Sequence, residues 1–181
     1  PDDILRKITP KTKAIIFVGL GGNTGQLKQV IQICQKYDIK LILDAAHMAG
    51  TRLDNVHIGQ DCDCSIFSFQ AVKNLPTADS GMICFKDSID DRNVRKFSWL
   101  GINKDTYERT QKMGLYRWDY DVESLGFKYH GNSIMASLGL VGLKYLDTDN
   151  AFRRKLAKIY ANELGENKKV EIIKTHDDCI S

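Results

Sequence analysis

Two short apolar runs, joined by a glycine-rich turn and one amphipathic stretch, limit what this 181-residue chain can fold into. Lys13–Val18 and Lys40–Asp44 are rich in β-branched and apolar residues, which predicts two buried strands. Gln26–Tyr37 lies between them and shows the spacing of a helix with one apolar face, formed by Leu27, Val30, Ile31 and Cys34. Strand, helix and strand within about thirty residues make a βαβ unit, so a mainly parallel sheet is expected.

The pattern continues with two more predicted strands at Cys64–Phe69 and Gly81–Phe85. Residues 87–121 are polar with scattered aromatics and are interpreted as helical pieces and loops. Ile134–Leu146 is strongly apolar and predicts a buried helix. Beyond it we expect a helix capped by Asp149 or Asn150 and a last strand at Val170–Lys174. The chain is therefore an α/β protein that changes character near residue 148.

Composition excludes several classes of partner. The chain is 43% hydrophobic and 27% charged with a net charge of +3, and charges of both signs are mixed along it. This balance favours neither nucleic acid nor a membrane surface.

No signal peptide opens the sequence and no apolar run is long enough to span a bilayer, so secretion is not expected. The five cysteines are scattered and fit free thiols of a reducing cytosol. No metal site is predicted at Cys62-x-Cys64, because no second pair stands at zinc-ligand spacing.

The turn Gly19–Gly25 (GLGGNTG) follows a predicted strand and precedes a predicted helix, as dinucleotide-binding turns do. Asp44 then ends the next strand, where such folds place the acidic residue that binds a ribose. The third glycine comes one residue late for G-x-G-x-x-G. A nicotinamide-binding oxidoreductase is thus one hypothesis, and a plain turn between strand and helix is the simpler interpretation.

A second hypothesis uses residues that a nicotinamide enzyme does not need. Pyridoxal phosphate (PLP) requires a carboxylate beside its pyridine nitrogen, and Asp44 ends a strand where open α/β sheets bind ligands. It also requires a lysine that forms a Schiff base with its aldehyde, and Lys73 follows the next strand. Ser68 precedes Lys73 by five residues and offers a hydroxyl to the phosphate, while His47 lies in position to contact the ring. Each residue alone has an ordinary structural explanation; the combination favours PLP.

These segments, DAAH at Asp44–His47 and FSFQAVKNL at Phe67–Leu75, resemble the sugar-nucleotide aminotransferases of the DegT/StrS type. The resemblance extends to Thr12–Ile16, to Leu125–Tyr129 and to the small-residue stretch Ser133–Leu146. It implies the PLP-dependent transferase fold type I, with a three-layer α/β/α large domain. Residues 1–148 would be the middle and end of that domain, and residues 149–181 the beginning of a small C-terminal domain.

The resemblance also implies roles. Asp44 matches the aspartate on the pyridine nitrogen, His47 the residue near the ring, Ser68 the phosphate-binding serine and Lys73 the Schiff-base lysine. His130 matches the residue that reaches the phosphate pocket of a partner subunit in a homodimer, although it replaces the usual arginine or asparagine. Asp79-Ser80-Gly81 departs from the usual Gly-Asp-Gly-Gly.

By this resemblance the protein is expected to be a cytoplasmic aminotransferase in amino-sugar and polysaccharide biosynthesis. It would move an amino group from glutamate onto a nucleoside-diphosphate-linked keto-sugar. The presence of Lys73 favours transamination over the dehydratases of the same family, which lack this lysine. A regulatory member of the fold that has lost turnover remains a third hypothesis.

Overall fold

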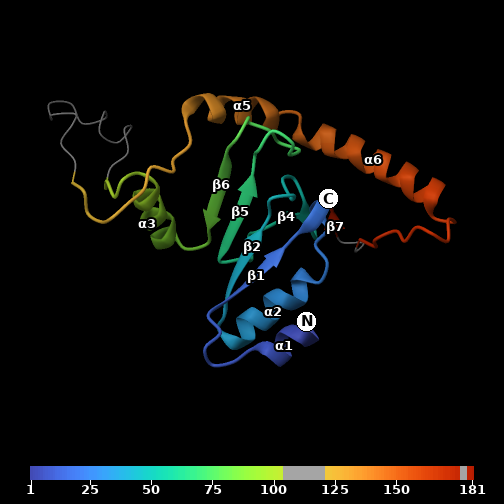
Figure 1. The fold of residues 1–181 in the computed structure, drawn as a ribbon, viewed down its shortest axis with the longest axis horizontal. Coiled ribbons are helices and arrows are strands. Elements are labelled where there is room, and N and C mark those ends of the chain that lie inside the picture. Colours follow the sequence, from blue (N-terminus) through green and yellow to red (C-terminus); the bar gives the residue numbers. More distant parts are fainter. Residues whose placement is uncertain (104–120, 176–178) are drawn as a thin grey trace.

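The computed structural model describes residues 1–103, 121–175 and 179–181. Its main sheet has the strand order β1-β2-β5-β6, formed by Ala14–Val18, Lys40–Asp44, Cys64–Ser68 and Gly81–Phe85. β1, β2 and β5 are parallel, and β6 runs antiparallel to β5 (Figure 1). The predicted α/β class, the mainly parallel sheet and the positions of these strands are confirmed.

One face of the sheet packs against α2 (Leu27–Tyr37), the helix predicted between the first two strands. Leu27, Val30 and Cys34 of α2 meet Leu41 and Leu43 of β2 in one buried cluster. The same cluster contains Met48, Ile58 and Phe67. The i, i+3, i+4, i+7 spacing of the helix and the alternation of the strand therefore create the core together.

The opposite face of the sheet is open within the described part of the chain. Ile16, Val18 and Ile66 point to this side and are 67%, 59% and 41% exposed. The prediction that the first strand is buried is therefore wrong for one of its two faces. β1 also lies at the end of the described strand order, so it has a neighbour on one side only.

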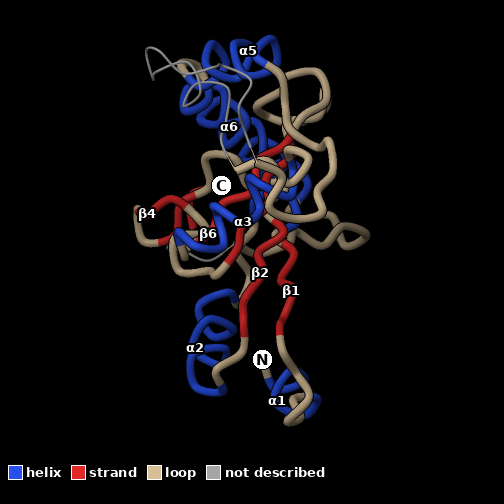
Figure 2. Tube along the Cα trace, turned by 90° about the vertical axis from the view of Figure 1, so that its left-hand side faces the viewer, coloured by secondary structure: helices blue, strands red, loops and turns tan. Residues whose placement is uncertain are grey.

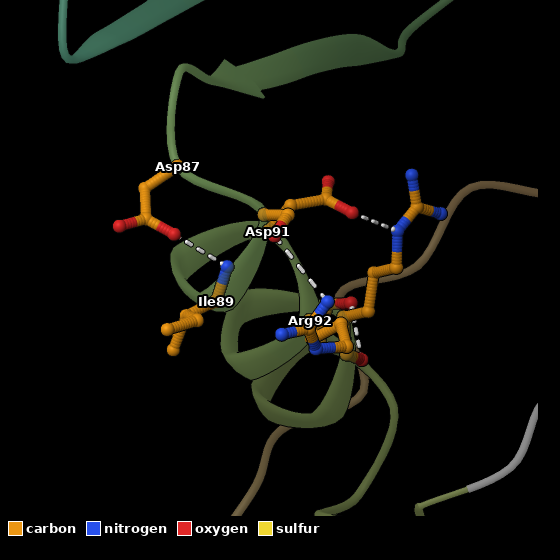
Figure 3. Close-up of polar contacts among 7 residues, drawn as sticks. Asp87, Ile89, Asp91 and Arg92 are labelled. Carbon is orange, nitrogen blue, oxygen red and sulfur yellow. Dashed lines mark hydrogen bonds and ion pairs between the residues drawn. The ribbon is translucent and has the colours of Figure 1, made fainter.

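The chain leaves β6 through α3 (Ser88–Ser98), which lies within the stretch predicted as helical pieces and loops. The Asp87 carboxylate accepts a hydrogen bond of 2.7 Å from the backbone N–H of Ile89 and so caps this helix (Figure 3). Asp91 accepts another of 2.8 Å from Nε of Arg95, one turn later. Residues 104–120 of the same predicted stretch lie outside the described residues.

Two helices lie at the end of the molecule opposite α1 (Asp2–Lys7) and α2 (Figures 1 and 2). Both differ from the prediction for residues 134–150. α5 (Ser133–Leu143) is apolar, yet none of its residues is buried, because its apolar side chains meet little else in the described chain. α6 (Leu146–Leu164) begins before Asp149 and Asn150, so neither residue is its cap. It runs without a break through residue 148, and a domain boundary there stays a prediction.

A small antiparallel sheet flanks the main one, with the order β4-β3-β7. β3 (Arg52–Leu53) and β4 (Val56–His57) form a hairpin through Asp54 and Asn55, both with positive φ. β7 (Cys179–Ile180) pairs with β3 on its other side. The prediction of a strand at Val170–Lys174 is wrong: those residues adopt neither helix nor strand.

Two further helical segments complete the described structure. α1 (Asp2–Lys7) precedes the first strand and has no buried residue. η1 (Leu20–Gly22) is a short 3-10 turn within the glycine-rich segment. Among the described residues, no helix combines the length and apolar character needed to cross a bilayer.

Asp63 joins the starts of the strands β2 and β5. Its carboxylate accepts hydrogen bonds of 2.8 Å from Nζ of Lys40 and 2.9 Å from the backbone N–H of Leu41. Partial burial alone would raise the pKa of this carboxyl group, but the hydrogen bonds from Lys40 and Leu41 outweigh that effect and lower the pKa below its ordinary value. The ionised form is therefore favoured by folding.

We predict that Asp63→Asn lowers stability near pH 7 by about 0.3–1 kcal/mol, the range of a partly exposed ion pair. Because the folded-state pKa lies below the unfolded value, the contribution of Asp63 is complete above about pH 4 and is lost as the pH falls further. Thermal unfolding between pH 7 and pH 2.5 should show the wild-type and variant curves converging at the acid end. Asp61→Asn controls for the loss of one nearby charge. Parallel curves for wild type and Asp63→Asn would contradict the prediction.

Candidate active site at the carboxyl edge of the sheet

Three loops meet where the parallel strands β1, β2 and β5 end. Val18, Asp44 and Ile66 lie side by side in register across these strands. Hydrogen bonds tie the following residues together: the Gly19 N–H donates to the Asp44 carbonyl at 3.1 Å, and the Ala45 N–H donates to the Ile66 carbonyl at 2.8 Å. The loops after β1, β2 and β5 therefore share one edge, as predicted for adjacent parallel strands.

The loop after β2 carries Asp44 and His47. Asp44 Oδ1 accepts a hydrogen bond of 3.1 Å from the Ala46 N–H, which holds the half-buried carboxylate at the end of the strand. His47 is exposed, and its Nδ1 accepts from the Gly21 N–H at 3.3 Å. The neutral ring therefore carries its proton on Nε2 and presents it as a donor.

The glycine-rich turn packs on this loop. A Cβ at Gly19 would lie 2.0 Å from Sδ of the buried Met48, so the side chain of Met48 packs directly against the glycine backbone. The N–H groups of Gly19, Gly21, Asn23 and Gly25 all donate within the turn or to the Asp44–His47 loop. A pyrophosphate would need such amides to be available, so the geometry does not support the nicotinamide hypothesis.

The loop after β5 carries Ser68 and Lys73. Ser68 Oγ accepts a long hydrogen bond of 3.4 Å from the Gln70 N–H, and the Lys73 N–H closes a turn onto the Gln70 carbonyl at 2.9 Å. Lys73 is half-buried, and its Nζ has no hydrogen-bond or ion-pair partner within the described ranges. A half-buried amine without a partner is available to a ligand.

The described contacts of His130 are with Ser98 and Trp99. Its N–H donates to the Ser98 carbonyl at 3.2 Å, and its ring meets the Trp99 ring edge-on at a centroid distance of 4.0 Å. The structure thus places His130 against the end of α3. In the part of the chain that is described, no hydrogen bond or ring contact joins it to Asp44, Ser68 or Lys73.

The cysteines Cys62 and Cys64 are buried in the structure. Burial, aided by the nearby Asp61 and Asp63, raises the pKa of the Cys62 thiol to about 12. Burial likewise raises the pKa of Cys64. Metal ligation requires the thiolate, so both residues fit neutral core thiols.

Sequence reasoning missed one set of residues at this edge. Asn74, next to Lys73, donates to the Ala49 carbonyl at 2.6 Å and to Asn150 Oδ1 at 3.1 Å. Asn150 lies on α6 and donates to the same carbonyl at 3.0 Å. The position of Asn74 next to Lys73 could have marked it as a candidate site residue. No local sequence pattern, however, connects Asn74 with Asn150.

The donor set at the edge fits PLP. Asp44 offers a carboxylate to a protonated pyridine nitrogen, Ser68 a hydroxyl to a phosphate, and Lys73 an amine to an aldehyde. His47 adds an N–H donor from the loop that also carries Asp44. These groups come from the ends of neighbouring strands, so the fold itself brings this chemistry together.

Comparison with protein families matches residues 1–179 to the DegT/DnrJ/EryC1/StrS aminotransferase family. The chain belongs to this family. Curated relatives include the uncharacterized protein MJ1066 of Methanocaldococcus jannaschii, 34% identical over 92% of this chain and 42% of its own length. The spore coat polysaccharide biosynthesis protein SpsC of Bacillus subtilis is 32% identical over 94% of this chain and 43% of its own length. The chain therefore spans less than half the length of these two relatives.

Solved structures of proteins described as aminotransferases share the fold. The aminotransferase TlmJ from Streptoalloteichus hindustanus superposes with a TM-score of 0.88 at 27% identity, over 99% of this chain and 46% of its own. Spr1654 from Streptococcus pneumoniae, in its PLP form, gives 0.82 at 26% identity, over 99% and 48%. The fold type I architecture expected from the sequence is confirmed.

The turn that precedes Asp79-Ser80-Gly81 contains a residue with positive φ. Ala78 adopts a φ of +79°, in the left-handed region that favours glycine. The turn around it is tightly held: the buried Thr77 donates through its N–H to the Phe69 carbonyl at 2.8 Å, and the Phe69 N–H donates to the Ser80 carbonyl at 2.8 Å. Ala78 is therefore strained by a turn that other contacts impose.

We predict that Ala78→Gly raises stability by about 0.5–1 kcal/mol, because removal of the Cβ relieves more strain than the added chain entropy costs. Thermal unfolding should show a rise of roughly 1–3 °C. Ala71→Gly, in the same loop but without a positive φ, is the matched control and should lower stability. Equal effects of the two substitutions would show that Ala78 is not strained.

Proposed function

We propose that the complete protein carrying this chain is a PLP-dependent sugar aminotransferase. The observation that carries the proposal is the shared edge of β2 and β5, where Asp44 and Ser68 end neighbouring strands and Lys73 follows in the loop after β5. Family membership, and relatives described as aminotransferases, support the same activity. PLP supplies an electron sink that the side chains themselves lack.

Each side chain has a distinct task in this proposal. Asp44 holds a proton on the ring nitrogen by charge pairing, and its bond from Ala46 fixes the direction of the carboxylate. Lys73 would supply the amine that holds the cofactor aldehyde and the base that moves the proton at the substrate carbon. Ser68 and nearby backbone N–H groups bind the phosphate. His47 steadies the ring through the Nε2 proton left exposed by its bond to Gly21.

The substrates and the assembly belong to the same proposal. The acceptor is a keto-sugar linked to a nucleoside diphosphate and the donor is glutamate; SpsC and PseC, named for polysaccharide and pseudoaminic acid biosynthesis, support the sugar class. In a homodimer, His130 would serve the phosphate pocket of the partner subunit, as the family resemblance implies. The five free cysteines suit a cytoplasmic location.

We predict that the complete protein with PLP shows the visible absorption band of a lysine-bound cofactor, and that Lys73→Ala removes this band. Turnover should fall on the order of 10²–10⁴-fold, because the amine that moves the proton is lost. Lys168→Ala, on the exposed segment after α6, is the matched control and should retain both the absorption band and the turnover. A band that survives Lys73→Ala would overturn the role of Lys73.

Two further measurements separate the competing hypotheses. Fluorescence titration with NADH should show no specific binding, whereas a nicotinamide enzyme would bind it. Mixing the PLP-loaded protein with glutamate in a single turnover should convert the cofactor to its amine form. A regulatory protein without turnover would leave the cofactor unchanged, which would overturn the proposed activity.

A further inference from the structure

Three amide hydrogen bonds tie the Lys73 loop to α6, and none of the roles above uses them. Asn74 Nδ2 donates one hydrogen to the Ala49 carbonyl at 2.6 Å and the other to Asn150 Oδ1 at 3.1 Å. Asn150 Nδ2 completes the ring with a bond of 3.0 Å to the same carbonyl. The three partners come from the loop after β5, the loop after β2, and α6.

The ring is buried at Asn150 and Ala49, half-buried at Asn74, and closely fitted. Asn150 is 6% exposed, so its amide depends on these partners. Gly50 has a φ of +85°, and a Cβ there would lie 2.5 Å from Asn150 Nδ2. Glycine thus allows α6 to approach the loop after β2 closely enough for the ring to form.

The packing around the ring shows what it holds. Leu146 and Asn150, four residues apart on one face, are the buried residues of α6. Leu146 packs with Ala49 and Leu75, which flank the ring on the two loops. The beginning of α6 is therefore docked on the cofactor edge, while the rest of the helix extends away from it (Figure 1).

The ring partners are close in sequence to the proposed cofactor residues. Asn74 follows Lys73 directly, and Ala49 lies two residues beyond His47. The apolar contacts of Leu146 could hold α6 against the loops without the asparagine hydrogen bonds, but hydrophobic contacts are non-directional and do not fix an orientation. The hydrogen bond from Asn74 Nδ2 to the Ala49 carbonyl joins the Lys73 loop to the loop after β2, and the bond from Asn74 Nδ2 to Asn150 Oδ1 joins it to α6, so both bonds orient the residue next to Lys73.

From this geometry we propose that Asn74 and Asn150 are positioning residues for Lys73, and that the docking of α6 sets the direction in which the lysine is presented. The proposal rests on the assignment of Lys73 as the cofactor-binding lysine. Neither asparagine touches the cofactor in it; both act through the loop that carries Lys73.

The test is a double-mutant cycle in the complete protein with Asn74→Ala, Asn150→Leu and the double variant. Leucine keeps the number and branching of the side-chain heavy atoms of Asn150 and removes its hydrogen bonds. PLP is titrated into each apoprotein, and the pH midpoint of the visible band of lysine-bound cofactor is recorded. Asn167→Ala, which removes an exposed side chain bonded to the Lys169 N–H, is the control.

Each single variant should weaken PLP binding about tenfold, or ~1.4 kcal/mol, and shift the pH midpoint. The double variant should be little worse than either single variant, since the ring is already broken by one substitution. Asn167→Ala should match wild type. A lower melting temperature with wild-type PLP affinity and pH midpoint would overturn the positioning role and leave only helix docking. Absence of the band in wild type would instead overturn the proposed function.

Discussion

The parallel pairing of β2 between β1 and β5 is the constraint on which the site depends. Its register puts Val18, Asp44 and Ile66 on one line, so the three following loops leave the sheet at the same edge. A shift by one residue would turn Asp44 to the α2 side and expose Leu43, which is fully buried. The burial of Leu41 and Leu43 against α2 thus fixes the side of the sheet on which the carboxylate lies.

A second level of order comes from contacts among the loops. Met48 fills the space left by Gly19, and the Gly21 N–H holds His47, so the glycine-rich turn supports the loop after β2. The ring of Asn74, Asn150 and Ala49 then joins that loop to the Lys73 loop and to α6. Backbone amides that resemble an anion-binding turn in the sequence are used here to hold the site together.

Local sequence patterns correctly predicted the helices and strands whose core contacts are with elements close to them in the sequence. The strands around α2 and the helix itself were predictable because their alternation and i, i+4 spacing match the face that is buried. Asp149 is a favourable cap by propensity, but α6 starts earlier because Leu146 and Asn150 are buried together on one face. α5 has an apolar sequence, yet none of its residues is buried. An apolar sequence favours burial but does not identify the surface against which the helix packs. The Asp54-Asn55 hairpin had a readable signal in two residues that tolerate positive φ.

The sequence by itself determined the chemistry of the candidate site: a carboxylate at the end of one strand, and a hydroxyl and an amine at the end of the next. Those residues are readable because strand ends are local and parallel neighbours share an edge. Only the tertiary structure decided that the glycine-rich turn is a packing element, that His130 packs on Trp99, and that α6 reaches the lysine loop. Contacts between residues as distant as Asn74 and Asn150 leave no local pattern, because they depend on how finished elements pack.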